Sequence, residues 1–124
     1  MKSPLKKLLF VYGTLKRGCS NHHFLEDQEF IGEARTVPGF RLYELGGHPG
    51  MVATAADRDG VTGESWAVDA EALVRLDGLE GLAAGMYRRD PIPLLAPYAD
   101  QAIEGYVYNR TVKNRRDIGG TWSE

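Results

Sequence analysis

Apolar residues in this chain occur in short runs, and glycine, proline or aspartate separates one run from the next. Runs of about four to eight residues bounded in this way are typical of β-strands joined by turns. The pattern predicts six or seven strands among the extended segments at residues 8–12, 30–37, 40–45, 51–55, 61–68, 87–95 and 101–109. Because Pro91 and Pro93 lack a backbone N–H, the segment 87–95 is expected at a sheet edge or a bulge.

Helical periodicity appears between the fifth and sixth of these segments. Three leucines recur at a spacing of three, which predicts a helix of about ten residues with one apolar stripe, formed by Leu73, Leu76 and Leu79. Asp69 can cap the start of this helix, and Asn21 can cap a second, short helix over residues 22–29. Short strands joined by turns, with few helices, predict an α+β domain with a barrel-like sheet that leaves few edges exposed.

The composition fits one folded domain. The chain has 124 residues, of which 43% are hydrophobic and 26% are charged, so it holds enough apolar material for a core. We expect a single domain over residues 1–124, with residues 110–124 as a loosely packed polar tail that Trp122 can anchor. The 15 glycines are many for this length, so several should lie where the backbone turns or closely approaches a ligand.

Charge and cysteine content exclude several classes of partner. The 15 Lys and Arg residues against 17 Asp and Glu give a net charge of -2, without the positive footprint of a nucleic-acid-binding protein. No apolar run reaches the roughly 20 residues of a membrane span. The first apolar run, at residues 8–12, is too short for a signal peptide and is followed by the charged residues Lys16 and Arg17. We expect a cytoplasmic protein, a monomer or small homo-oligomer, that binds neither nucleic acid nor membranes. The single cysteine, Cys19, permits no intramolecular disulfide.

The loop after the first predicted strand is the first candidate for chemistry. Gly13 and Gly18 have the spacing of a phosphate-binding loop, but Cys19-Ser20 stands where that motif needs Lys followed by Ser or Thr. A nucleotide site is therefore not favoured. Successive backbone N–H groups after a buried strand can bind an anion, although a plain turn with solvated Lys16 and Arg17 is the simpler interpretation of these residues.

Glu80 is the second candidate. It lies at or just past the end of the predicted helix, where a carboxylate faces the negative end of the helix dipole, so helix stability gives no reason for it. Its apolar and glycine neighbours predict a partly desolvated carboxyl with a raised pKa, suited to acid–base catalysis, whereas an exposed surface glutamate is the simpler alternative. Asp77, three residues earlier, also allows a carboxylate pair of the kind that hydrolyses glycosides.

Other reactive side chains are less informative. Cys19 follows Lys16 and Arg17, whose charges would lower the pKa of the thiol. The adjacent His22-His23 pair cannot face one site on a helix, and His48 is distant in sequence, so no metal site is expected. Tyrosines on predicted strands can line a pocket or belong to the core; these are Tyr87, Tyr106 and Tyr108.

Two motifs taken together resemble one known family. The first is FVYGTLKRG at residues 10–18, followed by Asn21-His22, and the second is LDGLEG at residues 76–81, followed by Tyr87-Arg88-Arg89. In this order they resemble the gamma-glutamylcyclotransferase-like family, which includes gamma-glutamylamine cyclotransferases and the AIG2-like, avirulence-induced proteins of plants. Intervening stretches also match in order, so the resemblance spans roughly residues 8–109.

The resemblance implies a fold, an activity and a site. The fold is a small mixed barrel with helices packed outside. The activity is cyclisation of a gamma-glutamyl amine, or a related gamma-glutamyl compound, to 5-oxoproline with release of the amine, and it needs no metal or cofactor. Glu80 would be the catalytic acid and base, and the substrate would be bound by Tyr12, Gly13, Thr14, Leu15 and Tyr87. The alternative is a non-catalytic small-molecule-binding or regulatory protein with the same pocket, because binding needs the loop but not the acid.

Overall fold

The computed structural model describes residues 6–124, in which eight strands, one α-helix and two short 3-10 helices are formed. The strands are β1 (Lys7–Val11), β2 (Glu29–Arg35), β3 (Phe40–Glu44), β4 (Pro49–Ala53), β5 (Thr62–Val68), β6 (Tyr87–Pro91), β7 (Ile103–Tyr108) and β8 (Arg116–Gly119). The helices are η1 (His22–Phe24), α1 (Ala70–Leu79) and η2 (Leu82–Ala84). None of the helices described is long and apolar enough to cross a membrane.

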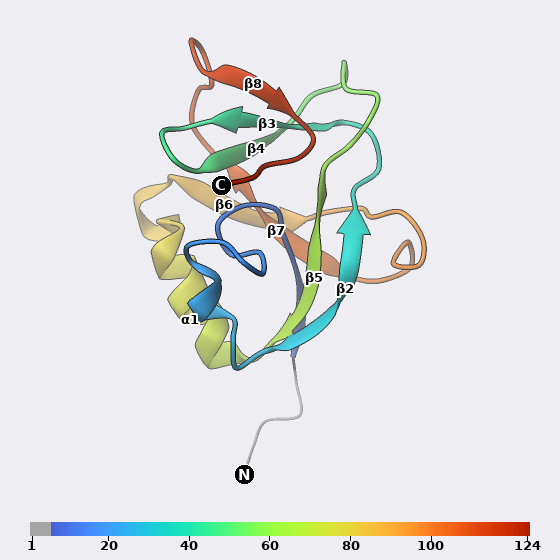
Figure 1. The fold of residues 1–124 in the computed structure, drawn as a ribbon, viewed down its shortest axis with the longest axis vertical. Coiled ribbons are helices and arrows are strands. Elements are labelled where there is room, and N and C mark those ends of the chain that lie inside the picture. Colours follow the sequence, from blue (N-terminus) through green and yellow to red (C-terminus); the bar gives the residue numbers. More distant parts are fainter. Residues whose placement is uncertain (1–5) are drawn as a thin grey trace.

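All eight strands belong to one mixed sheet. Seven strands follow the order β2-β5-β1-β7-β4-β3-β8, and the eighth strand, β6, pairs with β7. Strand β7 runs parallel to β1 and β4, whereas the other pairs are antiparallel. The sheet curves strongly, so that β3, β4 and β8 lie across the top of Figure 1 while β2 and β5 run along its side. The predicted α+β fold with a mixed, barrel-like sheet is confirmed, and β6 is the proline-containing edge strand.

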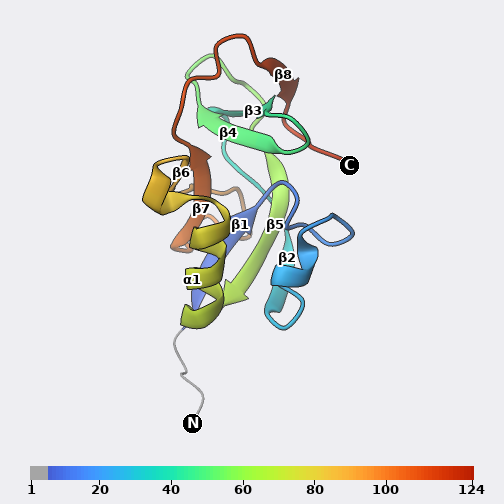
Figure 2. The same cartoon turned by 90° about the vertical axis from the view of Figure 1, so that its left-hand side faces the viewer.

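Helix α1 forms where the leucine periodicity predicts it. The Asp69 carboxylate accepts a hydrogen bond from the N–H of Ala72 at 2.8 Å and so caps the start of the helix. Gly81 adopts a left-handed conformation, with φ of 66°, and turns the chain away after its end. Figure 2 shows α1 beside β6 and β7. The second predicted helix, over residues 22–29, is represented only by the three residues of η1. The Asn21 side chain donates a hydrogen bond to Thr14 Oγ1 and does not cap this helix.

Two apolar clusters fill the interior, and β1 contributes to both. Successive side chains on a strand point to opposite faces, so Leu9 and Val11 enter one cluster while Phe10 enters the other. The first cluster also holds the buried face of α1. The second holds Met51 of β4 and the buried Trp122. The end of β1 and the loop after it therefore lie between the two clusters.

The end of the chain differs from the loosely packed tail that the sequence predicts over residues 110–124. Strand β8 pairs with β3, whereas the predicted anchoring by Trp122 is confirmed, because this side chain is only 5% exposed and lies in a core cluster. The carbonyl of Gly120 accepts a hydrogen bond from the N–H of Thr62 at 2.8 Å. Strand pairing satisfies backbone groups whatever the side chains are, and one buried indole supplies much apolar contact, so a polar composition did not reveal this order.

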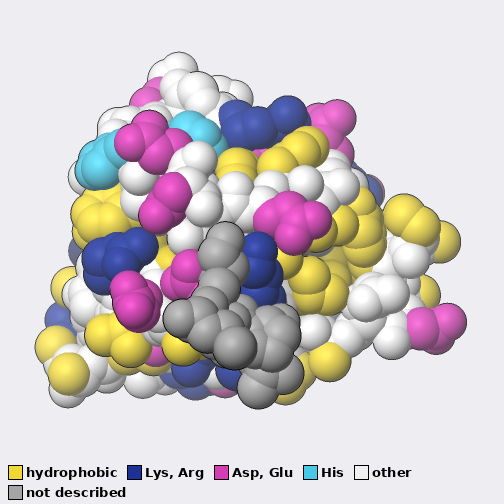
Figure 3. Space-filling view, turned by 90° about the horizontal axis from the view of Figure 1, so that it is seen from below, with side chains coloured by type: hydrophobic (Ala, Val, Ile, Leu, Met, Phe, Trp, Pro, Cys, Tyr) yellow, Lys and Arg dark blue, Asp and Glu magenta, His cyan; other side chains and the backbone are white. Residues whose placement is uncertain are grey.

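Charged side chains of both signs are mixed over the surface seen from below in Figure 3. This mixture agrees with the small net charge of the chain. Among residues 6–124, the large exposed apolar side chains lie on β2, on α1 and in the segment after β6; they are Ile31, Val74, Leu79 and Leu95. Scattered exposed residues of this kind are normal for a folded protein and indicate no particular partner.

Candidate functional site

The loop between β1 and η1 is a series of tight turns, and we call residues 13–21 the cradle loop. The N–H of Lys16 donates to the carbonyl of Gly13 at 3.1 Å, and the N–H of Asn21 donates to the carbonyl of Thr14 at 2.9 Å. Within residues 6–124, the N–H groups of Gly13, Thr14 and Leu15 donate to no backbone carbonyl outside the strand ladders. These three neighbouring donors therefore have no such backbone partner, and a row of N–H groups of this kind favours an anion.

Gly13 is a glycine because another strand approaches it closely. A Cβ at this position would lie 2.8 Å from Cγ of Pro49, the first residue of β4. From the sequence, several glycines are expected where the backbone turns or closely approaches a ligand. In the structure, the close packing of β4 against the cradle loop already requires a residue without a side chain at this position. Gly13 therefore allows the loop and β4 to pack together.

Glu80 lies directly after the last residue of α1. Its N–H donates to the carbonyl of Leu76 at 2.9 Å, so its backbone completes the final helical turn before Gly81 redirects the chain. The side chain is half-buried. Burial raises the pKa of the Glu80 carboxyl to about 7, as its apolar and glycine neighbours predict. A carboxyl with this pKa is populated in both protonation states near neutral pH.

A cavity of about 300 Å³ lies between the cradle loop and Glu80. Every residue to which the family resemblance gives a role lines this cavity, namely Tyr12, Gly13, Thr14, Leu15, Glu80 and Tyr87. His48 and Pro49 form part of the wall beside β4, and Met86 forms part of the wall before β6. The cavity is thus enclosed by a strand end, a helix end and two turns that are far apart in the sequence.

The tyrosines around the cavity use their hydroxyl groups to hold the walls. Tyr12 Oη donates to the carbonyl of Tyr106 at 2.6 Å and accepts from the N–H of Met51 at 3.1 Å. Tyr87 Oη donates to the carbonyl of Pro49 at 2.9 Å. Burial is the main reason that the pKa values of Tyr12 and Tyr87 lie above the ordinary value. The nearby Glu80 carboxylate raises both pKa values further. These phenols stay neutral and structural, so the backbone after Tyr12 is the better candidate for ligand contact.

Asp77 does not share the cavity with Glu80. Its Oδ1 accepts a hydrogen bond from Tyr106 Oη at 2.7 Å, and its Oδ2 lies 3.5 Å from Nη2 of Arg89. It is absent from the residues that line the cavity. The hydrolase hypothesis, which needs a second carboxylate beside Glu80, is therefore not supported.

Cys19 and His22 do not line the cavity between the cradle loop and Glu80. Burial raises the pKa of Cys19 by more than Lys16 lowers it, contrary to the prediction from neighbouring charges. His22 Nδ1 lies 3.2 Å from the carbonyl of Leu15, and the His22 ring packs against Trp66. Across residues 6–124, no group of three or more His, Cys, Asp or Glu side chains is arranged to hold a metal ion.

A buried carboxylate beside the cradle loop, Glu64 on β5, is not among the predicted site residues. Only 9% of its side chain is exposed, and it accepts hydrogen bonds from Arg17 in the cradle loop and from Trp66. A single charged residue in a strand whose other residues are all uncharged was the available signal, because carboxylates are rarely buried without partners.

Comparison with known proteins shows the family. The family described as gamma-glutamyl cyclotransferase, AIG2-like, matches residues 9–124. The chain belongs to this family. Among relatives in the gamma-glutamyl cyclotransferase family, a Vibrio cholerae protein named as a candidate gamma-glutamylcyclotransferase is 39% identical and covers 97% of this chain and 98% of its own. The human gamma-glutamylaminecyclotransferase is 36% identical, with 83% of this chain and 78% of the human protein covered.

Solved structures of similar proteins have the same fold. The Escherichia coli protein ytfP, solved by NMR, superposes with a TM-score of 0.69 at 31% identity and covers 94% of this chain and 96% of its own. The crystal structure of c4763 from uropathogenic E. coli superposes with a TM-score of 0.78 at 27% identity, covering 95% of this chain and 93% of that one.

Proposed function

We propose that this protein cyclises a gamma-glutamyl amine, or a related gamma-glutamyl compound, to 5-oxoproline and releases the amine. The observation that carries the proposal is Glu80, a half-buried carboxyl with a pKa of about 7 that lines the same cavity as Gly13, Thr14 and Leu15 of the cradle loop. The name of the human relative, a gamma-glutamylaminecyclotransferase, supports this substrate class.

The proposed chemistry is an intramolecular acyl transfer. The α-amine of the substrate attacks its own γ-carbonyl carbon, a new C–N bond closes the five-membered ring, and the C–N bond to the leaving amine breaks. The Glu80 carboxylate takes the proton that the attacking amine loses and delivers it to the leaving amine. No electron is gained or lost, and the reaction as written needs no metal or cofactor.

The cradle loop has a separate part in this proposal. The N–H groups of Gly13, Thr14 and Leu15 would bind the α-carboxylate of the substrate or the oxyanion that forms at the γ-carbonyl. Tyr12 and Tyr87 would bind the substrate as cavity walls whose phenols are fixed by hydrogen bonds. Because amine and carbonyl belong to one molecule, holding them in contact supplies much of the rate.

The test is to incubate the purified protein with gamma-glutamyl amines and gamma-glutamyl dipeptides and to measure 5-oxoproline. We expect product from at least one panel, and a fall in kcat of about 10²–10⁴-fold in Glu80→Gln, since the amide cannot transfer a proton. Glu71→Gln is the matched control, because Glu71 is an exposed carboxylate on the same helix. It should retain wild-type kcat.

Two outcomes would contradict the proposal at different levels. Full activity in Glu80→Gln would remove Glu80 from the mechanism while leaving the reaction in place. Binding of gamma-glutamyl compounds by the wild-type protein without formation of 5-oxoproline would overturn the enzymatic function and favour the non-catalytic small-molecule-binding alternative.

A further inference from the structure

The buried carboxylate of Glu64 binds the cradle loop at Arg17 and does not line the cavity beside Glu80. Glu64 lies on β5 opposite Val11, the last residue of β1. Its Oε1 accepts from the backbone N–H of Arg17 at 3.1 Å, and its Oε2 accepts from Nε of Arg17 at 3.1 Å. Oε1 also accepts from Nε1 of Trp66 at 3.1 Å. Both carboxylate oxygens thus have donors, and one of these donors is backbone of the cradle loop.

The Arg17 side chain is itself held in place. Its guanidinium carbon lies 3.7 Å from the centre of the Phe30 ring, and Phe30 packs edge-on against Trp66 with ring centres 5.3 Å apart. Cation–π stacking and a charge-assisted hydrogen bond therefore act on one side chain. Arg17 also offsets a repulsion, because Glu33 on β2 is the direct cross-strand partner of Glu64 and carries the same charge.

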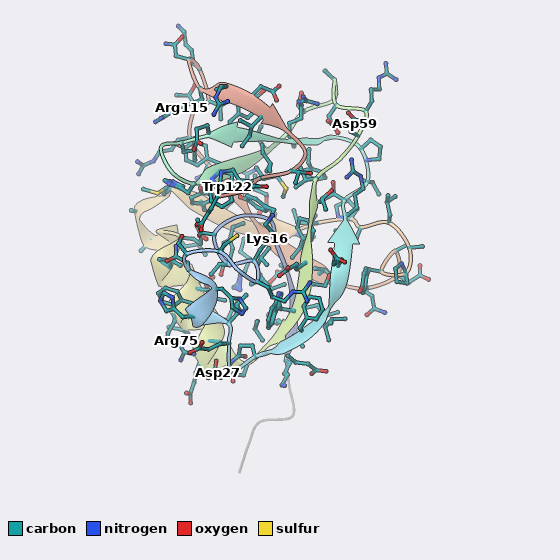
Figure 4. All side chains as sticks on the ribbon, in the orientation of Figure 1. Lys16, Asp27, Asp59, Arg75, Arg115 and Trp122 are labelled. Atoms are coloured by element: carbon teal, nitrogen blue, oxygen red, sulfur yellow. The ribbon has the colours of Figure 1, made fainter. Side chains whose placement is uncertain are left out.

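Hydrogen-bonded turns connect residue 17 to the cavity side of the loop. The N–H of Lys16 donates to the carbonyl of Gly13 at 3.1 Å, and the N–H of Cys19 donates to the carbonyl of Lys16 at 3.0 Å. Lys16 Nζ also donates to the carbonyl of Trp122 at 2.6 Å, and Figure 4 shows these two residues side by side. A displacement at residue 17 therefore moves the turn that presents the N–H groups of Gly13 to Leu15.

We propose that Glu64 is a positioning residue for the reaction, which fixes the backbone donors of the cradle loop through Arg17 without touching the substrate. Glu64 is not among the residues that line the cavity between the loop and Glu80. The inference rests on the proposed function, since it assigns the cradle loop to substrate binding. A merely structural Glu64 would affect the stability of the protein but not the kinetic constants of its folded fraction.

The experiment compares three single variants with the wild-type protein. Glu64→Ala removes all three hydrogen bonds to the carboxylate. Glu64→Gln keeps an oxygen for the backbone N–H of Arg17 but places an amide donor against Arg17 Nε. Glu33→Gln is the matched control, because Glu33 faces Glu64 across the strands and is exposed. For each variant we would measure the melting temperature, kcat and KM, and amide hydrogen exchange over residues 13–19.

We expect kcat/KM to fall by about tenfold or more in Glu64→Ala, because a small displacement of positioning groups is costly to an intramolecular reaction. Amide exchange over residues 13–19 should become faster in the same variant. Glu64→Gln should give a smaller change in both measurements, in the same direction, and also provides the test if Glu64→Ala does not fold. Glu33→Gln should leave kcat/KM and loop exchange unchanged.

Unchanged kcat/KM and loop exchange in folded Glu64→Ala, or in Glu64→Gln if the alanine variant is unfolded, would overturn the proposal even if the melting temperature falls. Failure of the proposed function has a different signature, namely an inactive wild-type protein. Hydrogen exchange needs no substrate, so it still decides in that case whether Glu64 holds the cradle loop.

Discussion

Asp57 and Glu80 are carboxylates withdrawn from water, yet their pKa values move in opposite directions. Burial acts to raise the pKa of Asp57, but three backbone N–H groups and Arg41 donate hydrogen bonds that outweigh it and lower the pKa to about 2. Burial raises the pKa of Glu80 to about 7 with no such opposition. The supply of donors, more than burial, decides which carboxylate is a fixed charge and which can exchange a proton near neutral pH.

The donors to Asp57 explain what this carboxylate does. The N–H groups of Gly39, Asp59 and Gly60 lie between 2.7 and 3.1 Å from its Oδ2. Arg41 on β3 donates to its Oδ1 and also binds Asp117 on β8. Asp57 therefore ties the turn before β5 to the β3–β4 hairpin and to β8, and it does not line the cavity.

The largest expected effect on stability is that of Asp57→Ala. It should lower the free energy of unfolding by about 3–5 kcal/mol at pH 7, because Arg41 and three backbone donors lose a buried acceptor. The folded pKa lies below the ordinary 3.8, so this stabilisation is present above about pH 3.8 and is lost as the pH falls through about 2. Urea denaturation checks both statements, and Asp57→Asn should lose less. Equal unfolding free energies for the wild type and Asp57→Ala at pH 7 would contradict the structural role.

Glu80→Gln should have the opposite effect and stabilise the protein. The folded pKa of about 7 exceeds the ordinary 4.5, so the folded state favours the protonated carboxyl. Wild-type stability is therefore greatest below about pH 4.5 and declines as the pH rises through 7. Since the amide is never charged, the variant should gain up to about 3 kcal/mol of unfolding free energy at pH 8 and almost nothing at pH 4. Equal gains at both pH values would show that the carboxyl charge is not the cause.

The same pKa predicts the pH dependence of the proposed reaction. The attacking amine must give its proton to the carboxylate form of Glu80, so kcat should rise about tenfold between pH 6 and pH 8, with its midpoint near 7. Steady-state kinetics over this range checks the prediction. Glu71→Gln should give the same profile, and a profile that is flat across the range would argue against Glu80 as the base.

Tyr106→Phe should have the smallest of these effects. It removes the 2.7 Å hydrogen bond from Tyr106 Oη to Asp77, but Asp77 keeps its ion pair with Arg89. We expect a loss of about 1 kcal/mol in the free energy of unfolding, measured by urea denaturation. A loss as large as that of Asp57→Ala would mean that Asp77 depends on this one donor, and that the number of donors is a poor guide to these carboxylates.

Local sequence patterns predicted α1 and the place of Glu80 because both depend on near neighbours. The leucine spacing defines the buried face of the helix, Asp69 defines its start, and apolar and glycine residues around Glu80 predict its raised pKa. Strand β8 escaped prediction because its short polar sequence has no period of its own. Its order comes from pairing with β3 and from the burial of Trp122.

The sequence by itself determined the family, the strand-rich fold with its main helix and the residues to examine, since motifs and periodicity are properties of short segments. Only the tertiary structure decided what those residues meet. It placed Pro49 against Gly13. It paired Asp77 with Tyr106 and Arg89, outside the cavity, and brought the Glu64 carboxylate into hydrogen-bond contact with Arg17 of the cradle loop. Such partners come from segments distant in the chain, and the free energy of a buried carboxylate depends on which donors the fold brings to it.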